Sequence, residues 1–330
     1  MSNFTLNPSI RATAKRLFRG NRSIWVTDTG VLHNFERMIR LEGVSLGTKT
    51  AGPFPARDIL GADEVRPTSE GVSIRTGIRW IDLGSDWVDH ENNPFGSFEL
   101  IGTLTEASDR RGVFGSLAAS MATDAANVPV LTGVCFEADG TAWATDRYRL
   151  ARVSTGLRLA GSPDTRLIVS GRLMAEAAKA KTWELNVGTA YTSVNLNGLI
   201  LTARNIEGNY PNVEWLMPDG GCGEVSITFP VSKMLDALKS LAVPKGAPVE
   251  LWSDGTVAYQ GAEVRLTDDP VNKVSRIGVD PKRLAQMLKT HGAKAVATLH
   301  WRSSEPQRPM YVTIDGEDDL RMLIMPVRLP

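Results

Sequence analysis

The chain has 330 residues, 42% of them hydrophobic, which is enough for two or three domains with packed cores. Its 37 Lys and Arg residues balance 37 Asp and Glu residues, which excludes a whole-molecule field that would attract nucleic acid or a membrane. Two cysteines, Cys135 and Cys222, argue against a disulfide framework and a thiolate metal site. No stretch of consecutive apolar residues comes near the length of about 20 that a membrane-spanning helix needs. We therefore expect a soluble, cytoplasmic protein without membrane association.

A strand followed by a capped helix is the recurring unit of the chain. Phe4–Leu6 alternates as a strand, Asn7 and Pro8 are typical of a helix start, and residues 9–19 have helical spacing. The unit recurs in a short version over 52–60, and further helices are predicted over 105–121, 170–181, 230–241 and 280–291.

Strand-like runs with alternating polarity lie between these helices and turn at pairs such as Asp254-Gly255. Helices spread evenly through a mostly antiparallel β chain predict an α+β fold with two helices per domain. The breaks suggest three domains, over 1–96, 97–218 and 219–330.

The predicted helices are more basic than the rest of the chain. If they all face one way, their Lys and Arg side chains form a surface that meets phosphates without reading sequence. Alternatively, these residues are simply good helix formers on solvated faces. The candidate residues of this phosphate-facing surface are Arg11, Lys15, Arg16, Arg19, Arg110, Arg111, Arg172, Lys179, Lys181, Lys233, Lys239, Lys282, Arg283 and Lys289.

Residues 130–156 are predicted to contain a β-hairpin with Asp139-Gly140 as its turn. Residues 144–150, ATDRYRL, then place polar and basic side chains beside Leu150, which we expect to be exposed. This combination is typical of a docking surface, or alternatively of a sheet edge with solvated arginines.

The segment ATDRYRLA resembles the ATDGHRLA signature of the bacterial-type DNA polymerase III beta subunit, the DNA sliding clamp. VLTGVCFE upstream is similar to the Y-L-N-G-x-L-F-E of that family, residues 207–218 to its D-G-x-F-P-D-Y…V-L-P segment, and Met325–Leu329 to its terminal M-P-M-R-L. Residues 98–329 follow the second and third domains of the family in order. Only 4–6 and 54–60 resemble its first domain, which is shorter here.

The resemblance implies three similar clamp domains, each with antiparallel sheets outside and two helices inside, assembling as a homodimer into a ring around duplex DNA. It implies a processivity factor that tethers the replicative DNA polymerase and is loaded by a clamp loader ATPase, with no catalytic residue, cofactor or metal. Arg147, Tyr148 and Trp215 depart from the Gly, His and basic residue of the family. The altered signature and short first domain fit a divergent or phage-encoded member, and a cellular source stays open.

The resemblance also implies a peptide-binding cleft between the second and third domains. Leu323, Met325, Val327 and Leu329 alternate, so a final core strand is the alternative reading of that part. The cleft residues are Leu131, Thr145, Arg147, Tyr148, Arg149, Leu150, Pro211, Trp215, Leu216, Leu323, Met325, Pro326, Val327, Arg328 and Leu329.

Parts of the sequence are also compatible with other functions. The shortened first domain leaves open a non-encircling module that only recruits partners through the cleft. Exposed acidic pairs such as Asp318-Asp319 leave open a carboxylate-dependent nuclease, although no convergent pocket supports it. Gly43–Thr50 resembles a phosphate-binding loop only loosely, and the four histidines lack metal-binding spacing.

Overall fold

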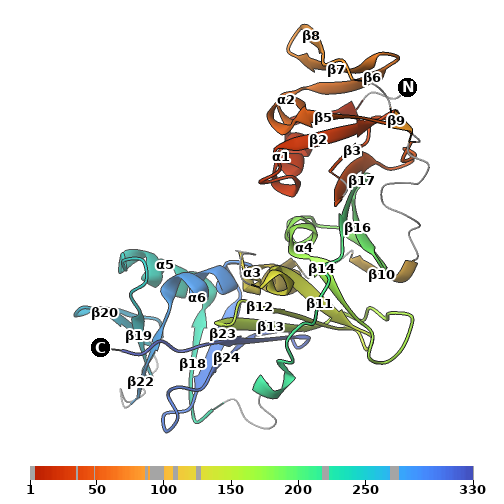
Figure 1. The fold of residues 1–330 in the computed structure, drawn as a ribbon. Helices are drawn as coiled ribbons and strands as arrows, with labels where there is room; N and C mark the ends of the chain where they lie inside the picture. The colour runs from red at the N-terminus through yellow and green to blue at the C-terminus, as the bar shows by residue number, and fades with distance from the viewer. Residues whose placement is uncertain are drawn as a thin grey trace. The chain divides into compact units, whose positions relative to one another are not determined.

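The computed structural model describes residues 4–34, 36–47, 49–85, 88–89, 100–106, 111–123, 128–217, 223–267 and 275–329. The chain forms two compact units (Figure 1). Unit 1 comprises Met1–Ala107 and Leu157–Ile206, and unit 2 comprises Ser108–Gly156 and Glu207–Pro330. The predicted domain boundaries at 96/97 and 218/219 lie outside the described residues, so they stay a prediction.

Unit 1 is built on two antiparallel sheets. A nine-stranded sheet has the order β10 (Leu100–Glu106), β15 (Trp183–Gly188), β16 (Tyr191–Leu196), β17 (Leu199–Arg204), β4 (Arg37–Leu41), β3 (Leu32–His33), β2 (Ser23–Thr27), β5 (Lys49–Pro55) and β9 (Val88–Asp89). A four-stranded sheet has the order β1 (Phe4–Thr5), β6 (Glu64–Thr68), β7 (Gly71–Thr76) and β8 (Arg79–Asp82). The long sheet joins strands from opposite ends of the unit, because β17 pairs with β4 from Leu199↔Leu41 to Ala203↔Arg37.

Three helices complete unit 1: α1 (Pro8–Leu17), α2 (Ala56–Gly61) and α4 (Gly171–Ala177), which follows strand β14 (Arg166–Ser170). The side chain of Asn7 accepts a hydrogen bond of 2.9 Å from the Ile10 amide, and Pro8 fills the first helical position. The predicted start of the first helix is therefore confirmed.

Unit 2 also contains two antiparallel sheets. The first has the order β11 (Gly133–Glu137), β12 (Thr141–Thr145), β13 (Arg149–Ser154), β25 (Leu320–Ile324), β24 (Met310–Ile314), β23 (Val296–Trp301) and β18 (Val225–Pro230). The second has the order β21 (Ala262–Arg265), β20 (Thr256–Tyr259), β19 (Val249–Trp252) and β22 (Arg276–Val279). The pairing of β13 with β25 brings the middle of the chain and its C-terminal part into one sheet.

Helices α3 (Arg111–Ser120), α5 (Val231–Ser240) and α6 (Pro281–Leu288) lie along one side of unit 2 (Figure 1). Helix α3 approaches the end of α6 closely, because a Cβ atom on Gly115 would lie 2.8 Å from the Thr290 side chain. Ser116 Oγ and His291 Nε2 are 2.9 Å apart in this contact, and both side chains are buried. Glycines at the contact are thus what lets the two helices meet.

The structure contains a helix within each of the six predicted helical segments. Two predictions need correction. Thr105 and Glu106 belong to strand β10, where they pair with Glu184 and Trp183, so these two residues are not helical. The described helix α3 covers Arg111–Ser120, and residues 107–110 of the predicted helix lie outside the described residues. The alternation of residues 100–106 suits a strand, and sheet pairing prevails over the helical spacing.

The second correction concerns the start of the predicted hairpin. Residues Pro129–Thr132 form a short 3-10 helix, η1, before strand β11 begins. In addition, the segment from Gly43 to Gly47 links strand β4 to strand β5 and has no helix after it, which removes the phosphate-loop alternative.

A buried carboxylate holds α1 to α4 within unit 1. Arg16 donates from Nε to Glu176 Oε1 at 2.6 Å and from Nη2 to Oε2 at 2.7 Å, and Lys179 Nζ lies 2.7 Å from Oε1. The Glu176 side chain is only 5% exposed. Burial alone would raise the pKa of this carboxyl, but Arg16 and Lys179 together hold the pKa below its ordinary value of 4.5.

We expect Arg16→Ala to lower the free energy of unfolding by about 2 kcal/mol near neutral pH, because a buried carboxylate loses its bidentate partner. Since the folded pKa of Glu176 is lowered, the ion pair stabilises the fold above the ordinary pKa, and this contribution is lost as the pH falls through the folded value. The deficit of the variant should therefore shrink in acid. Urea unfolding near neutral pH and below the ordinary pKa of Glu176 measures this deficit. Arg57→Ala is the control, since the Arg57 side chain is 88% exposed. An equal deficit at both pH values would contradict the assignment.

Candidate functional site

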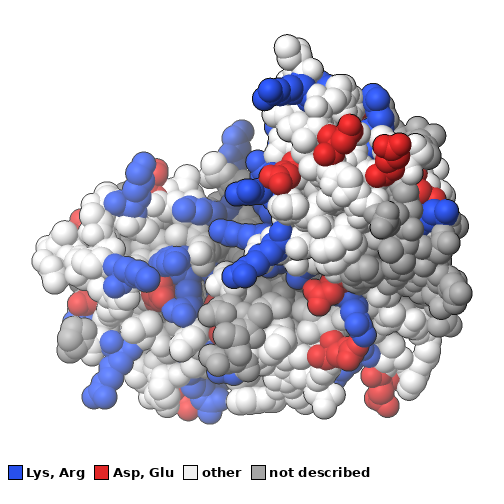
Figure 2. Space-filling view, turned by 45° about the horizontal axis from the view of Figure 1, so that its top comes forward, with Lys and Arg blue, Asp and Glu red and all other residues white. Residues whose placement is uncertain are grey.

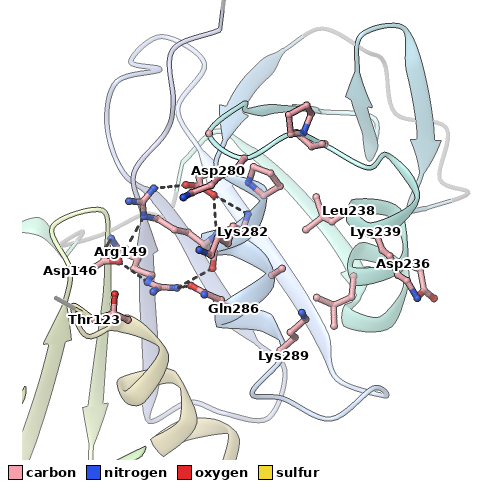
Figure 3. A pocket seen from close by; sticks show the side chains of 18 residues that line it. Thr123, Asp146, Arg149, Asp236, Leu238, Lys239, Asp280, Lys282, Gln286 and Lys289 are labelled. Carbon is pink, nitrogen blue, oxygen red and sulfur yellow. Dashed lines mark hydrogen bonds and ion pairs between the residues drawn. The ribbon is translucent and has the colours of Figure 1, made fainter. Parts of the chain in front are cut away.

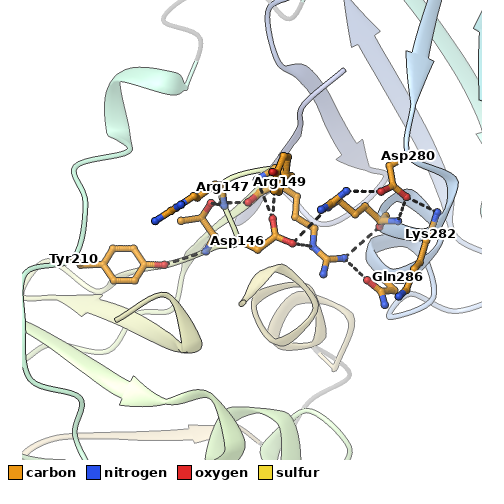
Figure 4. A network of polar contacts seen from close by, with 10 residues as sticks. Asp146, Arg147, Arg149, Tyr210, Asp280, Lys282 and Gln286 are labelled. Atoms are coloured by element: carbon orange, nitrogen blue, oxygen red, sulfur yellow. Dashed lines mark hydrogen bonds and ion pairs between the residues drawn. The ribbon is translucent and has the colours of Figure 1, made fainter. Parts of the chain in front are cut away.

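The ATDRYRL segment forms a tight turn between β12 and β13, fixed by its own side chains (Figure 4). Asp146 Oδ1 accepts hydrogen bonds of 3.0 Å from the amides of Tyr148 and Arg149. Thr145 Oγ1 accepts from the Arg147 amide at 3.0 Å and donates to the Arg149 carbonyl at 2.7 Å. Arg147 sits at φ 77°, in the left-handed region that favours glycine.

Tyr210 anchors a second segment to this turn. Its hydroxyl accepts a hydrogen bond of 3.0 Å from the Thr145 amide, as Figure 4 shows. Burial raises the pKa of Tyr210 far above its usual value, so the phenol stays neutral. Residues 207–217, which include the short 3-10 helix η2 (Glu214–Leu216), are thereby tied to the turn.

The C-terminal segment meets the turn from the other side. Leu150 and Leu323 are register partners in the β13–β25 ladder, and the Met325 amide donates to the Tyr148 carbonyl at 2.7 Å. Further on, the Val327 amide donates to the Gly278 carbonyl at 2.8 Å. The C-terminal segment therefore runs from the turn to strand β22.

A pocket of about 420 Å³ lies beside the end of this path. Gly278 is required there, because a Cβ atom would lie 2.2 Å from the Val327 carbonyl oxygen. The pocket is lined by Arg276, Ile277, Gly278, Pro306, Gln307, Pro326, Val327, Arg328 and Leu329. It contains four of the predicted cleft residues, all from the C-terminal segment.

The predicted cleft residues differ in their exposure. Leu131, Thr145, Arg149, Leu150 and Leu323 are buried. The expectation that Leu150 is exposed is wrong, because Leu150 lies on strand β13 inside the sheet, between β12 and β25, and is only 3% exposed. Strand β25 ends at Ile324, so Leu323 belongs to a core strand while the following residues do not. Leu216, Met325, Pro326, Val327 and Leu329 are half-buried, and Arg147, Tyr148, Pro211, Trp215 and Arg328 are exposed.

Two aromatic side chains stand out on this surface. Tyr148 is 54% exposed and Trp215 is 75% exposed, and within the described part of unit 2 they are the exposed large hydrophobic residues. Trp215 Nε1 donates to the Asn212 carbonyl at 3.1 Å, which satisfies its polar atom and leaves the ring face free for contact. Both residues fall at predicted cleft positions.

An ionic network joins the turn to helix α6 (Figure 4). Arg149, which is 6% exposed, donates from Nε to Asp146 Oδ2 at 3.0 Å and from Nη1 to Gln286 Oε1 at 2.8 Å. Arg283 lies 3.8 Å from the same Asp146 oxygen, and its guanidinium stacks 4.1 Å from the centre of the Tyr148 ring. Burial lowers the pKa of Arg149 and Asp146 raises it in part. Neither Asp280 nor Gln286 was among the predicted site residues.

A larger pocket of about 860 Å³ opens on the helical side of the same network (Figure 3). Asp280 caps α6 by accepting from the Lys282 and Arg283 amides, and it also pairs with the Arg283 side chain. Asp146, Asp236 and Asp280 are the acids of the lining. The cations of the lining are Arg149, Lys239, Lys245, Lys282, Arg283 and Lys289, so the pocket carries an excess of positive charge.

The predicted DNA-facing residues separate into two groups. Arg11, Arg16, Arg172 and Arg283 are engaged inside the protein, Arg172 by donating to the Leu17 and Arg19 carbonyls at the end of α1. Arg110 lies outside the described residues, as does the side chain of Arg111. Figure 2 shows Lys and Arg side chains spread over the helical side of unit 2, with few acidic ones among them. The second group is exposed and comprises Lys15, Arg19, Lys181, Lys233, Lys239, Lys282 and Lys289. Arg16 and Lys179 are exposed as well, but both pair with Glu176.

The described residues contain neither a metal-binding cluster nor a membrane-spanning helix. Among the described residues, no group of three or more His, Cys, Asp or Glu side chains is arranged to hold a metal ion. Within the same residues, no helix is long and apolar enough to cross a membrane.

We expect Asp146→Asn to lower the free energy of unfolding by about 2 kcal/mol, because the amide can keep the turn hydrogen bonds but leaves the buried Arg149 charge without its carboxylate. Asp254→Asn is the matched control, since Asp254 accepts from the Thr256 amide at 3.0 Å and has no ion pair among the described residues. Urea unfolding compares the two variants. Equal losses in both would contradict the charge argument.

Comparison with known proteins shows which proteins the chain resembles. Residues 110–212 match the family model of the DNA polymerase III beta subunit, central domain. No curated protein sequence matches the chain. The Bacillus subtilis DNA polymerase sliding clamp is 16% identical, with a TM-score of 0.68 over 99% of both chains.

Two further solved structures are similar over their whole length. The beta subunit of DNA polymerase from Streptococcus pyogenes is 20% identical, with a TM-score of 0.68 over 99% of this chain and 100% of that one. The Helicobacter pylori beta clamp bound to a DNA ligase peptide is 14% identical, with a TM-score of 0.69 over 99% of both chains. The chain therefore has the fold of the bacterial sliding clamps throughout, and residues 110–212 match the central-domain model of the DNA polymerase III beta subunit.

Proposed function

We propose that this protein is a DNA polymerase processivity factor, a sliding clamp that encircles duplex DNA and tethers the replicative polymerase and other partners. The observation that carries the proposal is the meeting of the ATDRYRL turn with the C-terminal segment, through Met325 and Tyr148, on a chain with the clamp fold throughout. A clamp holds DNA by topology and performs no chemistry, so the protein needs neither catalytic residues nor a cofactor.

The surface around the turn is proposed to bind an extended peptide of the partner protein. The exposed rings of Tyr148 and Trp215 offer apolar contact area at one side, and the half-buried residues from Met325 to Leu329 offer it at the other. Burying a single apolar side chain on such a surface contributes about 1.5–3 kcal/mol. The Helicobacter pylori clamp with its bound DNA ligase peptide supports this mode of docking.

The helices are proposed to face the DNA. Exposed lysines line the basic pocket, among them Lys282 on α6, Lys289 directly after α6, and Lys239 on α5. Lysine side chains make salt-sensitive contacts with phosphates and read no bases, which permits sliding.

Ring closure is proposed to use strand β8 of one copy and β21 of another. Each is an edge strand of its own four-stranded sheet. Ile78 next to β8 is 101% exposed, and Trp80 and Ile81 within it are 39% and 46% exposed. An open apolar edge favours pairing with another chain, and two such head-to-tail contacts close a dimer. A clamp loader ATPase would then be needed to open the ring onto DNA.

The dimer predicts a solution mass of twice 35.9 kDa, measured by light scattering across a dilution series. We expect the double variant Ile78→Asp, Ile81→Asp to be monomeric, because buried unpaired carboxylates oppose the contact. Leu100→Asp is the control, since Leu100 is 53% exposed but lies on β10. A wild-type monomer at every concentration would remove the ring and favour the non-encircling recruiting module. A wild-type dimer that is retained on circular duplex DNA and lost on cutting it would support encirclement.

Charge reversal of α6 tests the DNA-facing assignment. We expect Lys282→Glu combined with Lys289→Glu to weaken binding of duplex DNA at low salt and to reduce the slope of log K against log salt by about 2, one per lost phosphate contact. Arg321→Glu is the control, because Arg321 is exposed on strand β25. Fluorescence anisotropy with labelled duplex measures both quantities. An unchanged slope in the double variant would contradict the proposal that Lys282 and Lys289 face the DNA.

A further inference from the structure

Arg147 occupies a backbone position at which its side chain is a disadvantage. Its φ of 77° lies in the left-handed region, where residues with a Cβ atom meet steric strain and glycine does not. The backbone there is fixed by neighbours, since the Arg147 amide donates to Thr145 Oγ1 and the Tyr148 carbonyl accepts from Met325. A glycine would make the same backbone contacts without the strain.

The Arg147 side chain also does nothing for the fold that the structure reveals. It is exposed and has no hydrogen bond or ion pair within the described part of the chain. The two other arginines of this network are neutralised, Arg149 by Asp146 and Arg283 by Asp280. Figure 4 shows Arg147 pointing away from Arg149, on the side where Tyr210 lies. Among the described residues, Arg147 is therefore the positively charged side chain of this turn that has no ion pair.

The surroundings of Arg147 offer apolar contacts. Tyr148 follows it directly, and the Tyr210 anchor ties the segment carrying exposed Trp215 to the same turn. Glu214, the acid next to Trp215 on that segment, is exposed and forms no ion pair with Arg147 in the described structure. An unpaired guanidinium beside exposed aromatic rings is suited to a peptide that carries both apolar side chains and a carboxylate.

We propose that Arg147 determines specificity at the docking surface by binding an Asp or Glu side chain of the partner peptide, placed between its apolar anchors. This inference rests on the proposed peptide-docking function and adds the partner's chemistry to it. The strain at residue 147 is kept because the guanidinium is needed in the complex, while the free protein gains nothing from it.

The test uses the full-length protein and immobilised peptides with both ends blocked, so that no terminal carboxylate can substitute for a side chain. Leu and Phe alternate with Ser in these peptides, and each Ser in turn is replaced by Asp or by Asn. We expect wild-type protein to prefer Asp over Asn at one position by about threefold to tenfold in Kd, and to lose the preference at high salt.

Three variants separate charge from backbone. Arg147→Gly should lose the preference for Asp and unfold at a higher temperature, because the strain is relieved. Arg147→Gln should lose the preference without gaining stability. Ala242→Gly is the backbone control, since Ala242 has φ 46° just after α5, so it should gain stability and keep the preference.

The results distinguish carboxylate binding by Arg147 from phosphate contact and from failure of the docking function itself. Peptides that bind wild type without distinguishing Asp from Asn, or a preference that survives in Arg147→Gly, would overturn the inference and leave peptide docking standing. A loss of duplex DNA binding in Arg147→Gln without any change in peptide preference would instead assign the side chain to phosphate contact and overturn it. If no apolar peptide binds at all, the docking function fails and the inference falls with it.

Discussion

The Asp146 carboxylate is the constraint on which the candidate site depends. One oxygen accepts the amides of Tyr148 and Arg149 and so sets the shape of the turn, and the other pairs with Arg149 and lies near Arg283. The same group therefore fixes where Tyr148 is displayed and neutralises a buried guanidinium. Because Arg149 also reaches Gln286, the turn and helix α6 are held as one body within unit 2. The docking surface and the basic pocket thus share a single ionic support.

Charge in this chain has two uses. The formal net charge is zero, yet exposed lysines gather on the helices, where phosphate contacts are proposed. Several arginines from the same helices instead hold the protein together, such as Arg16 on the buried Glu176 and Arg172 on the carbonyls that end α1. The difference follows the chemistry of the two side chains: the planar guanidinium bonds several acceptors at once, whereas the ammonium is a strongly hydrated point charge. A count of basic residues per helix does not make this distinction.

The departures from the family signature have different structural consequences. Tyr148 is an exposed ring supported from below by Arg283, which enlarges the apolar surface. Trp215 does the same on the other segment, with its indole nitrogen satisfied by the Asn212 carbonyl. Arg147 adds charge in a conformation better suited to glycine. All three changes enlarge or charge the candidate docking surface, while the buried residues beneath it, Leu150 and Leu323, stay in the sheet.

The amino-acid sequence by itself determined the approximate positions of the six helices found among the described residues, because caps and helical spacing are local properties. It also determined the family resemblance, since short motifs in register need no folded structure to be recognised. The start of α3 was missed, because strand β10 gains pairing with β15 that local spacing cannot indicate. Only the tertiary structure decided that Leu150 is buried on a strand that pairs with Leu323, that Arg172 bonds the carbonyls at the end of α1, and that Asp280 and Gln286 lie beside the ATDRYRL turn. These contacts join residues more than a hundred positions apart, and packing between distant segments is set by the whole fold and not by the neighbours of each residue in sequence.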